Sequence, residues 1–368
     1  MGFKVKYVDL RQSYLNQKEE IDTAINRVMM NGSFILRDDV SKFEERIASF
    51  IGTEYAVGVN SGTDALILSC IAAGLKENDE VITVGHTFVA TVAAIHHCRA
   101  KPVLVDIDKD FNIDINKIEE RITNKTKAII PVHLNGRSCN MDSIMHLAKK
   151  YDLIVIEDAC QSVGAKFNNQ NVGTFGLFSC FSLHPMKSLN CSGDGGYITT
   201  NNKELYERLL ALRNNGQSLD KTDIYEFGYS SRLDNLQAAI ANIRLNLLHQ
   251  NNNRRREIAT IYNKELQGLA ITLPQAVDSD NRYYDVFNSY VIQVENRDEL
   301  YSYLRDKGIE VFTHIPKPLS EYSSLNLEGE HLSTNKIICK KILSLPIYPE
   351  LSNEDLEYTI AVIKEFYK

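Results

Sequence analysis

The segment Leu153-Ile-Val-Ile-Glu-Asp-Ala-Cys-Gln161 decides the fold, because it joins an apolar run to polar residues that follow it directly. It belongs to a series of short apolar and β-branched runs at residues 55–59, 80–83, 101–105, 128–132, 153–156, 178–181 and 197–200. Segments with the helical spacing of apolar residues separate several of these runs. Strands that are apolar throughout and alternate with helices predict an α/β domain, in which helices cover both faces of a largely parallel sheet.

The pattern changes after Gly228, where a long, polar-rich helical stretch extends over residues 233–266. Beyond it the sequence predicts a strand at 289–294, a helix at 297–307, a second strand at 310–313 and a closing helix at 353–367. We therefore predict two domains: a large one over residues 1–249, including an N-terminal arm, and a smaller C-terminal α/β domain over residues 250–368.

Two residues near the centre of the chain indicate the chemistry. Asp158 follows a strongly apolar strand, and Lys187 ends the stretch Cys180-Phe-Ser-Leu-His-Pro-Met-Lys187, just before the glycines of Gly193-Asp-Gly-Gly196. Pyridoxal phosphate needs both groups: its aldehyde forms a Schiff base with a lysine amine, and its ring accepts electrons while the pyridine nitrogen stays protonated. A buried carboxylate beside that nitrogen favours the protonated form. We therefore predict that Lys187 and Asp158 are catalytic.

Other positions near strand ends fit the same cofactor. Ser61-Gly62-Thr63 lies between a strand and a helix, where backbone N–H groups suit a phosphate, although such a turn is also a common helix cap. Phe88 could stack on the cofactor ring or could be a core residue. Gln161 could reach the phenolic oxygen of the cofactor, and Ser182 could bind the phosphate.

Composition argues against several other classes of protein. The formal net charge of −7 is unfavourable for nucleic acid or an anionic membrane as the main partner. No apolar run approaches the roughly 18 residues of a membrane helix, and no signal peptide is apparent, so we expect a cytoplasmic protein. Seven cysteines without a Cys-x-x-Cys pair indicate free thiols in a reducing compartment, and we expect no metal site. The run Arg254-Arg255-Arg256 is predicted to be a solvated helix face.

Blocks of sequence along nearly the whole chain resemble the DegT/DnrJ/EryC1/StrS family, the sugar aminotransferases of the aspartate aminotransferase superfamily (fold-type I). The blocks are Tyr7-Val-Asp-Leu10, Gly32-Ser-Phe-Ile-Leu36, Ala56-Val-Gly-Val-Asn-Ser-Gly-Thr-Asp-Ala-Leu66, His86-Thr-Phe-Val-Ala-Thr91, Ile130-Pro-Val-His-Leu-Asn-Gly136, Ile156-Glu-Asp-Ala-Cys-Gln161, Phe181-Ser-Leu-His-Pro-Met-Lys187, Gly193-Asp-Gly-Gly196, Ser231-Arg-Leu-Asp-Asn-Leu-Gln-Ala-Ala239 and Leu343-Ser-Leu-Pro346.

The resemblance implies a role for each candidate residue. Lys187 would carry pyridoxal phosphate, Asp158 would contact its ring nitrogen and Gln161 its phenolic oxygen. Phe88 would stack on the ring, and the phosphate would be bound by Gly62, Thr63 and Ser182.

The resemblance also implies a homodimer with its active sites at the subunit interface. Family members send an asparagine across that interface to the partner's phosphate, but in Gly228-Tyr-Ser-Ser-Arg232 the shorter Ser230 occupies this position. His184 and His314 match positions that line the sugar pocket.

The activity that the resemblance implies is transfer of an amino group from L-glutamate to a keto-sugar. Family members mostly act on nucleotide-linked hexoses, in the biosynthesis of amino sugars for surface polysaccharides or glycoconjugates. A related branch consists of sugar dehydratases, but these have histidine in place of the lysine. A cofactor-free regulatory or binding protein on the same scaffold is the other alternative.

Overall fold

The computed structural model describes residues 2–218 and 220–368, and a seven-stranded sheet forms its centre. The strand order is β1-β9-β8-β5-β4-β2-β3. The strands are β1 (Tyr55–Val59), β2 (Glu80–Val84), β3 (Lys101–Val105), β4 (Thr126–Ile129), β5 (Ile154–Asp158), β8 (Phe178–Ser182) and β9 (Gly196–Thr200). Strand β9 is antiparallel to both of its neighbours, whereas the other adjacent pairs are parallel. The predicted α/β fold with a largely parallel sheet is confirmed.

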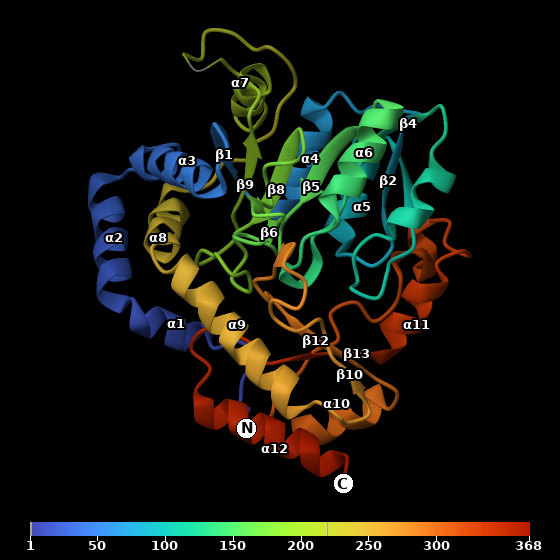
Figure 1. Ribbon diagram of the computed structural model, residues 1–368. Helices are drawn as coiled ribbons and strands as arrows, with labels where there is room; N and C mark the ends of the chain where they lie inside the picture. The colour runs from blue at the N-terminus through green and yellow to red at the C-terminus, as the bar shows by residue number, and fades with distance from the viewer. Residues whose placement is uncertain (1, 219) are drawn as a thin grey trace.

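Helices pack on both faces of this sheet (Figure 1). One apolar cluster joins α4 (Gly62–Ala72), α5 (Val89–His97) and α7 (Lys203–Leu212) to the sheet. On the opposite face, α3 (Asp38–Ile51), α6 (Met141–Tyr151) and α8 (Asn235–Leu245) pack through two further clusters. The N-terminal helices α1 (Leu10–Asn16) and α2 (Lys18–Asn31) lie outside this layer, and α2 packs against α8. Burial of each sheet face explains why most positions of the strands are apolar or β-branched.

The C-terminal part has its own apolar core around the antiparallel sheet β10-β12-β13. Its elements are α9 (Leu248–Glu265), β10 (Ile271–Thr272), β12 (Tyr290–Val294), α10 (Arg297–Asp306), α11 (Ser333–Lys341), β13 (Ile342–Leu345) and α12 (Asn353–Phe366). A short sheet of β6 (Lys166–Phe167), β7 (Gln170–Asn171) and β11 (Tyr283–Tyr284) lies between the two parts. Val5 belongs to the C-terminal core, so the N-terminal arm reaches this part of the molecule. The boundary at residue 250 stays a prediction.

Three details differ from the sequence predictions. The helical stretch 233–266 is divided into α8 and α9, because α8 packs on the large sheet whereas α9 continues to the C-terminal core (Figure 1). The segment 310–313 forms only an isolated bridge, between Phe312 and Ser344, instead of a strand. The segment 116–122, one of those with helical spacing between the predicted strands, forms two 3₁₀ turns, Ile115–Lys117 and Glu119–Arg121, instead of an α-helix.

The prediction of a solvated arginine face on α9 is wrong. Arg255 and Arg256 are 5% and 9% exposed, so both are buried. The Arg255 guanidinium donates to the carbonyl oxygen of Ile347 (2.6 Å), and Arg256 donates to that of Asp285 (2.8 Å). Both arginines therefore connect α9 to neighbouring loops. Charge in a sequence does not reveal such partners, because a buried guanidinium can be satisfied by backbone carbonyls.

Helix α11 is attached to the large domain by two buried polar groups. The carboxylate of Asp106 accepts hydrogen bonds from the N–H groups of Thr334 and Asn335, both 2.9 Å, at the start of the helix. Nδ1 of His86 donates to Oδ1 of Asn335 (3.1 Å), and burial lowers the pKa of His86 to about 4. The imidazole is therefore neutral in the folded protein at neutral pH.

This lowered pKa predicts acid sensitivity. An unfolded histidine has a pKa of about 6.5, so between pH 6.5 and 4 the unfolded chain binds more protons at His86 than the folded one. The neutral His86 therefore contributes to the free energy of unfolding fully above pH 6.5. This contribution is lost as the pH falls towards 4, by up to about 3 kcal/mol. Denaturant unfolding across this range should show a shallower pH dependence in His86→Asn than in wild type. The surface variant His249→Gln is the control, and an equal slope in His86→Asn and wild type would contradict the assignment.

Candidate active site

The turn that carries Lys187 follows β8 and is tightly held. The Lys187 N–H donates to the carbonyl oxygen of His184 (2.8 Å). Nδ2 of Asn190 donates to the carbonyl oxygens of Pro185 (2.8 Å) and Lys187 (2.9 Å), and Arg244 in turn donates to Oδ1 of Asn190. These contacts fix the backbone on both sides of the lysine, so the position of its amine depends mainly on its own side-chain torsions.

Asp158 is the last residue of β5 and is 5% exposed. Its Oδ2 accepts a hydrogen bond from Oγ1 of Thr91 (2.7 Å), and its Oδ1 accepts one from the N–H of Cys160 (3.2 Å). Among the described residues, no cation forms an ion pair with this carboxylate. A buried carboxylate without a positive partner is costly, so the site suits a ligand that brings a protonated nitrogen.

Helix α4 and strand β8 converge next to Asp158. Ser61 caps α4, its Oγ accepting a hydrogen bond from the Asp64 N–H (3.0 Å). A Cβ added to Gly62 would lie 2.8 Å from Cβ of Ser182 and 3.0 Å from Sγ of Cys160. A Cβ added to Gly196 would lie 2.7 Å from the Gly62 nitrogen. The structure thus brings Gly62 and its neighbour Thr63 to Ser182 at a helix N-terminus, the geometry that favours a phosphate.

This close approach makes Gly62→Ala a test of the phosphate site. The added methyl group has to displace Ser182 or Cys160, and such overpacking typically costs about 1–3 kcal/mol. We expect pyridoxal phosphate to bind the apoprotein about tenfold more weakly, since 1.4 kcal/mol is a factor of ten. Titration of apoprotein with the cofactor measures this change, and the melting temperature without cofactor controls for a general loss of stability. Unchanged affinity would show that the phosphate does not lie here.

Phe88 caps the N-terminus of α5, and 67% of its surface is exposed. The alternative that it is a core residue is therefore excluded. Phe88 lies three residues before Thr91, which donates a hydrogen bond to Asp158. A largely exposed aromatic ring at this position is suitably placed to stack on a ligand ring.

Gln161 is oriented by the backbone. Its Oε1 accepts a hydrogen bond from the N–H of Asn135 (2.9 Å), a residue in the left-handed region (φ 58°). This contact fixes the orientation of the amide, because only the oxygen can accept. The amide nitrogen is then available as the donor, as contact with a phenolic oxygen requires.

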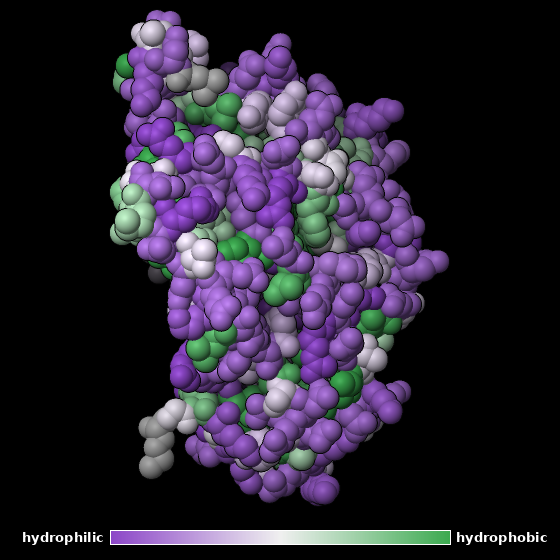
Figure 2. Space-filling view, turned by 90° about the vertical axis from the view of Figure 1, so that its left-hand side faces the viewer, coloured by the Kyte–Doolittle hydropathy of each residue, from purple (hydrophilic) through white to green (hydrophobic). Residues whose placement is uncertain are grey.

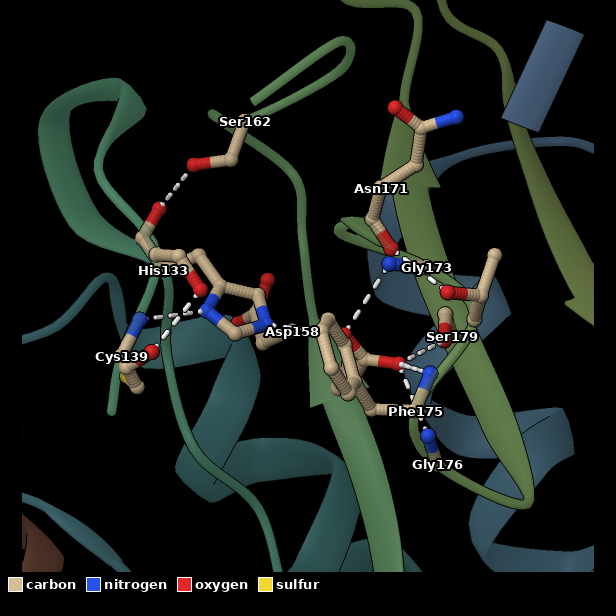
Figure 3. Close-up of polar contacts among 12 residues, drawn as sticks. His133, Cys139, Asp158, Ser162, Asn171, Gly173, Phe175, Gly176 and Ser179 are labelled. Atoms are coloured by element: carbon tan, nitrogen blue, oxygen red, sulfur yellow. Dashed lines mark hydrogen bonds and ion pairs between the residues drawn. The ribbon is translucent and has the colours of Figure 1, made fainter. Parts of the chain in front are cut away.

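Glu157, which precedes Asp158 in β5, is fully buried and forms the centre of a hydrogen-bonded hub. Figure 3 labels the residues that donate to Glu157. Its carboxylate accepts five hydrogen bonds of 2.7–3.0 Å, and the donors are His133 Nε2, Ser179 Oγ and the N–H groups of Gly173, Phe175 and Gly176. Burial alone would raise the pKa of Glu157, but His133 and the backbone N–H groups outweigh it and lower the pKa.

The hub continues towards the site residues. Nδ1 of His133 accepts from the Cys139 N–H (3.0 Å), so the ring is neutral and its proton is on Nε2. The His133 N–H donates to the carbonyl oxygen of Asp158 (3.0 Å), and the His133 carbonyl oxygen accepts from Ser162 Oγ (2.5 Å). The hub therefore fixes the strand end that carries Asp158. Sequence reasoning missed it, because neither residue has a distinctive spacing.

The two predicted sugar-pocket histidines both lie near Lys187. Nε2 of His314 is 2.9 Å from the hydroxyl of Tyr7, and its ring stacks on Phe312 at 5.7 Å. His314 is exposed on this subunit, yet partial desolvation of its ring and the charge of Lys187 lower the pKa of His314 to about 4. The same two causes lower the pKa of His184. Both imidazoles are thus neutral hydrogen-bonding groups at neutral pH.

Ser230 does not join this group within the subunit by any contact among the described residues. It is exposed, and its Oγ accepts a hydrogen bond from Arg232 (2.8 Å). Its neighbour Ser231 is buried instead and donates to Oδ2 of Asp64 in the first turn of α4 (2.6 Å). The segment therefore passes close to the phosphate candidates, with Ser230 on its outer side.

Known proteins match this chain over its whole length. The profile of the DegT/DnrJ/EryC1/StrS aminotransferase family matches residues 15–364. The chain is 40% identical over 371 residues to the pleiotropic regulatory protein of Geobacillus stearothermophilus, a match that covers 99% of each chain. It is also 40% identical over 364 residues to the dTDP-3-amino-3,6-dideoxy-alpha-D-galactopyranose transaminase of Aneurinibacillus thermoaerophilus, covering 98% of this chain and 99% of that one. The crystal structure of S. venezuelae DesV in complex with a ketimine intermediate has a TM-score of 0.96 at 36% identity, covering 100% of this chain and 99% of DesV. The chain belongs to the DegT/DnrJ/EryC1/StrS aminotransferase family.

Proposed function

We propose that this protein uses pyridoxal phosphate to move an amino group from L-glutamate to the keto group of a nucleotide-linked sugar. One observation carries the proposal. Three groups occur together: Lys187 in the turn after β8, a buried carboxylate at the end of β5 that pairs with no cation among the described residues, and a glycine-lined helix N-terminus after β1. These are the groups that the aldehyde, the protonated ring nitrogen and the phosphate of the cofactor require. The residues present therefore fit the cofactor.

When bound, the cofactor supplies an electron sink for the carbon that loses its proton. Lys187 would hold the cofactor and, once released, would move the proton at its Nζ. Asp158 would keep the ring nitrogen protonated, and the Gln161 amide would donate to the phenolic oxygen. Gly62, Thr63 and Ser182 would bind the phosphate, while the exposed ring of Phe88 would exclude water from one face.

The amino donor carries carboxylates, and suitable cations border a cavity of about 220 Å³ that is also lined by Lys187. Arg244 and Arg255 both line it, and neither forms an ion pair within the described residues. Burial lowers the pKa of Arg255 to about 10, so its charge lacks full compensation. Arg255 is buried and Arg244 is half-buried, and the carboxylate of Glu350 also lines the cavity. Two guanidinium groups beside one carboxylate leave room for a further anion, which supports glutamate as the donor.

The hydroxyl groups of a keto-sugar require neutral hydrogen-bonding partners, unlike the carboxylates of the amino donor. His184 and His314 are neutral near Lys187 and can exchange hydrogen bonds with sugar hydroxyls without attracting a second anion. The relative from Aneurinibacillus thermoaerophilus is named as a transaminase of a dTDP-linked sugar, which supports a nucleotide-linked substrate here. Free thiols at all seven cysteines support a cytoplasmic location.

A homodimer would cover the apolar residues that this subunit leaves exposed. Met29 and Met30 at the end of α2, and Tyr225 and Phe227 before Ser230, are each more than half exposed. Figure 2 shows the side of the molecule that carries α1 and α2, where hydrophobic residues interrupt the hydrophilic surface. Exposed apolar groups of this kind mark interaction sites.

None of the helices in residues 2–218 and 220–368 has the length and apolar character to cross a bilayer.

The experiment is a panel of nucleotide-linked and free keto-sugars, incubated with glutamate and the purified protein loaded with pyridoxal phosphate. Release of 2-oxoglutarate and the mass of the aminated sugar are measured, with Lys187→Ala as the control. An aminated product from at least one nucleotide-linked sugar is expected.

A protein that neither binds the cofactor nor aminates a sugar would instead support the cofactor-free regulatory role, as the name of the Geobacillus stearothermophilus relative suggests. Retention of Lys187, Asp158 and Gln161 in one site argues against that alternative. The dehydratase alternative is disfavoured, because lysine occupies position 187 in place of histidine.

A further inference from the structure

Two buried threonines form a hydrogen-bonded pair behind Asp158. Oγ1 of Thr91 donates to Oδ2 of Asp158 (2.7 Å), and Oγ1 of Thr87 lies 2.8 Å from Oγ1 of Thr91. Thr91 is fully buried and Thr87 is 3% exposed, so no bulk water competes for these hydroxyls. Thr87 lies two residues before α5 begins, and Thr91 lies in the first turn of that helix, four positions further along the chain.

The direction of both hydrogen bonds follows from proton count. An ionised carboxylate can only accept, so the single hydroxyl proton of Thr91 points to Asp158. Thr91 must then accept from Thr87. The chain of donors runs from Thr87 through Thr91 to the carboxylate, and hydrogen bonds in such a chain strengthen one another in a medium of low polarity.

The pair also determines the orientation of the carboxylate. Thr91 occupies Oδ2, and the Cys160 N–H occupies Oδ1 from the other side. Rotation about the Cβ–Cγ bond would break one of these contacts, so the carboxylate plane is set before any ligand arrives. Thr87 directly precedes Phe88, and the same pair therefore links the carboxylate to the exposed ring.

We propose that Thr91, supported by Thr87, is a positioning residue. It holds the carboxylate of Asp158 in the orientation that contacts the cofactor's ring nitrogen while Phe88 covers the ring. The proposal rests on the proposed use of pyridoxal phosphate. It assigns the hydroxyl of Thr91, and not its methyl group, as the part that matters. Preorganisation of this kind raises cofactor affinity and turnover together, because a carboxylate that need not reorient loses less free energy on binding.

Matched variants separate the hydroxyl from the methyl group. Thr91→Val keeps the shape and removes the hydroxyl, whereas Thr91→Ser keeps the hydroxyl and removes the methyl group. Thr359→Val removes a hydroxyl that is equally buried and hydrogen-bonded (2.8 Å to the Asp355 carbonyl) in the C-terminal part. The readouts are the affinity of each apoprotein for pyridoxal phosphate, the visible spectrum of the loaded protein, and kcat and KM for the sugar.

We expect Thr91→Val to bind the cofactor about tenfold more weakly, as loss of a charge-assisted hydrogen bond would produce. Its visible spectrum should shift, and kcat should fall more than KM rises. Thr87→Val should show a smaller effect in the same direction, and Thr91→Ser should resemble wild type. Thr359→Val should lower the melting temperature without a change in cofactor affinity.

Wild-type affinity and spectrum in Thr91→Val would overturn the proposal. So would equal losses in Thr91→Ser and Thr91→Val, because the side chain would then act through packing alone. Cofactor affinity is measured without any sugar, so failure of the aminotransferase assignment would leave this comparison intact. Wild-type apoprotein that does not bind pyridoxal phosphate would contradict the proposed function itself.

Discussion

Lys187→Ala is expected to remove the covalent link to the cofactor and to lower turnover by about a thousandfold or more. The reason is twofold: the amine is both the attachment point and the group that carries the proton. The turn around residue 187 is held by Asn190 through backbone oxygens, so the variant should keep the wild-type fold. A timed assay of the product measures turnover, the visible spectrum reports the covalent link to the cofactor, and circular dichroism reports the fold.

Lys166→Ala, on the short strand β6, is the matched control for that variant, and it should retain both spectrum and turnover. If Lys187→Ala kept wild-type turnover, another lysine would hold the cofactor, and the assignment of the site would be wrong.

Asp158→Ala is expected to cost far more in turnover than in folding. Without the carboxylate the ring nitrogen loses the charge that keeps it protonated, and a loss of one such electrostatic contact typically lowers kcat by about a hundredfold to a thousandfold. The folding cost should be limited to the unsatisfied Thr91 hydroxyl and Cys160 N–H, about 1–3 kcal/mol. Steady-state kinetics and denaturant unfolding of the purified variant measure the two effects.

Two variants make this result specific to the charge at position 158. Asp158→Asn keeps an acceptor for Thr91 but removes the charge, so it should lose turnover with a smaller loss of stability. Asp106→Asn alters a carboxylate that is also buried but caps α11, and it should lower stability while kcat changes little. A variant of Asp158 with wild-type turnover would refute its role.

The fold could be predicted because its signals are local in the sequence. Each strand of the large sheet contains a run of apolar or β-branched residues. Asp158 and Ser182, which the sequence places near strand ends, are the last residues of β5 and β8. The convergence of Gly62 with Ser182 follows from the rule that functional residues gather at the carboxyl ends of strands.

The remaining features depend on contacts between distant segments. The contact of Asn135 with Gln161 joins two loops, and the contact of Thr91 with Asp158 joins a helix to a strand end. Neither follows from spacing within one segment. The burial of Arg255 has the same origin, since its acceptor at Ile347 lies 92 residues away. A sequence pattern shows which side chain is present, but not which carbonyl oxygen accepts its hydrogen bond.

Reduction of the loaded protein with borohydride, followed by peptide mass mapping, tests the central claim most directly. Borohydride converts a lysine imine of pyridoxal phosphate into a stable pyridoxyl amine, so the modified residue can be located. We predict a single modified site at Lys187, and none in Lys187→Ala. A pyridoxyl group on a different lysine, or none in wild-type protein that binds the cofactor, would contradict the account.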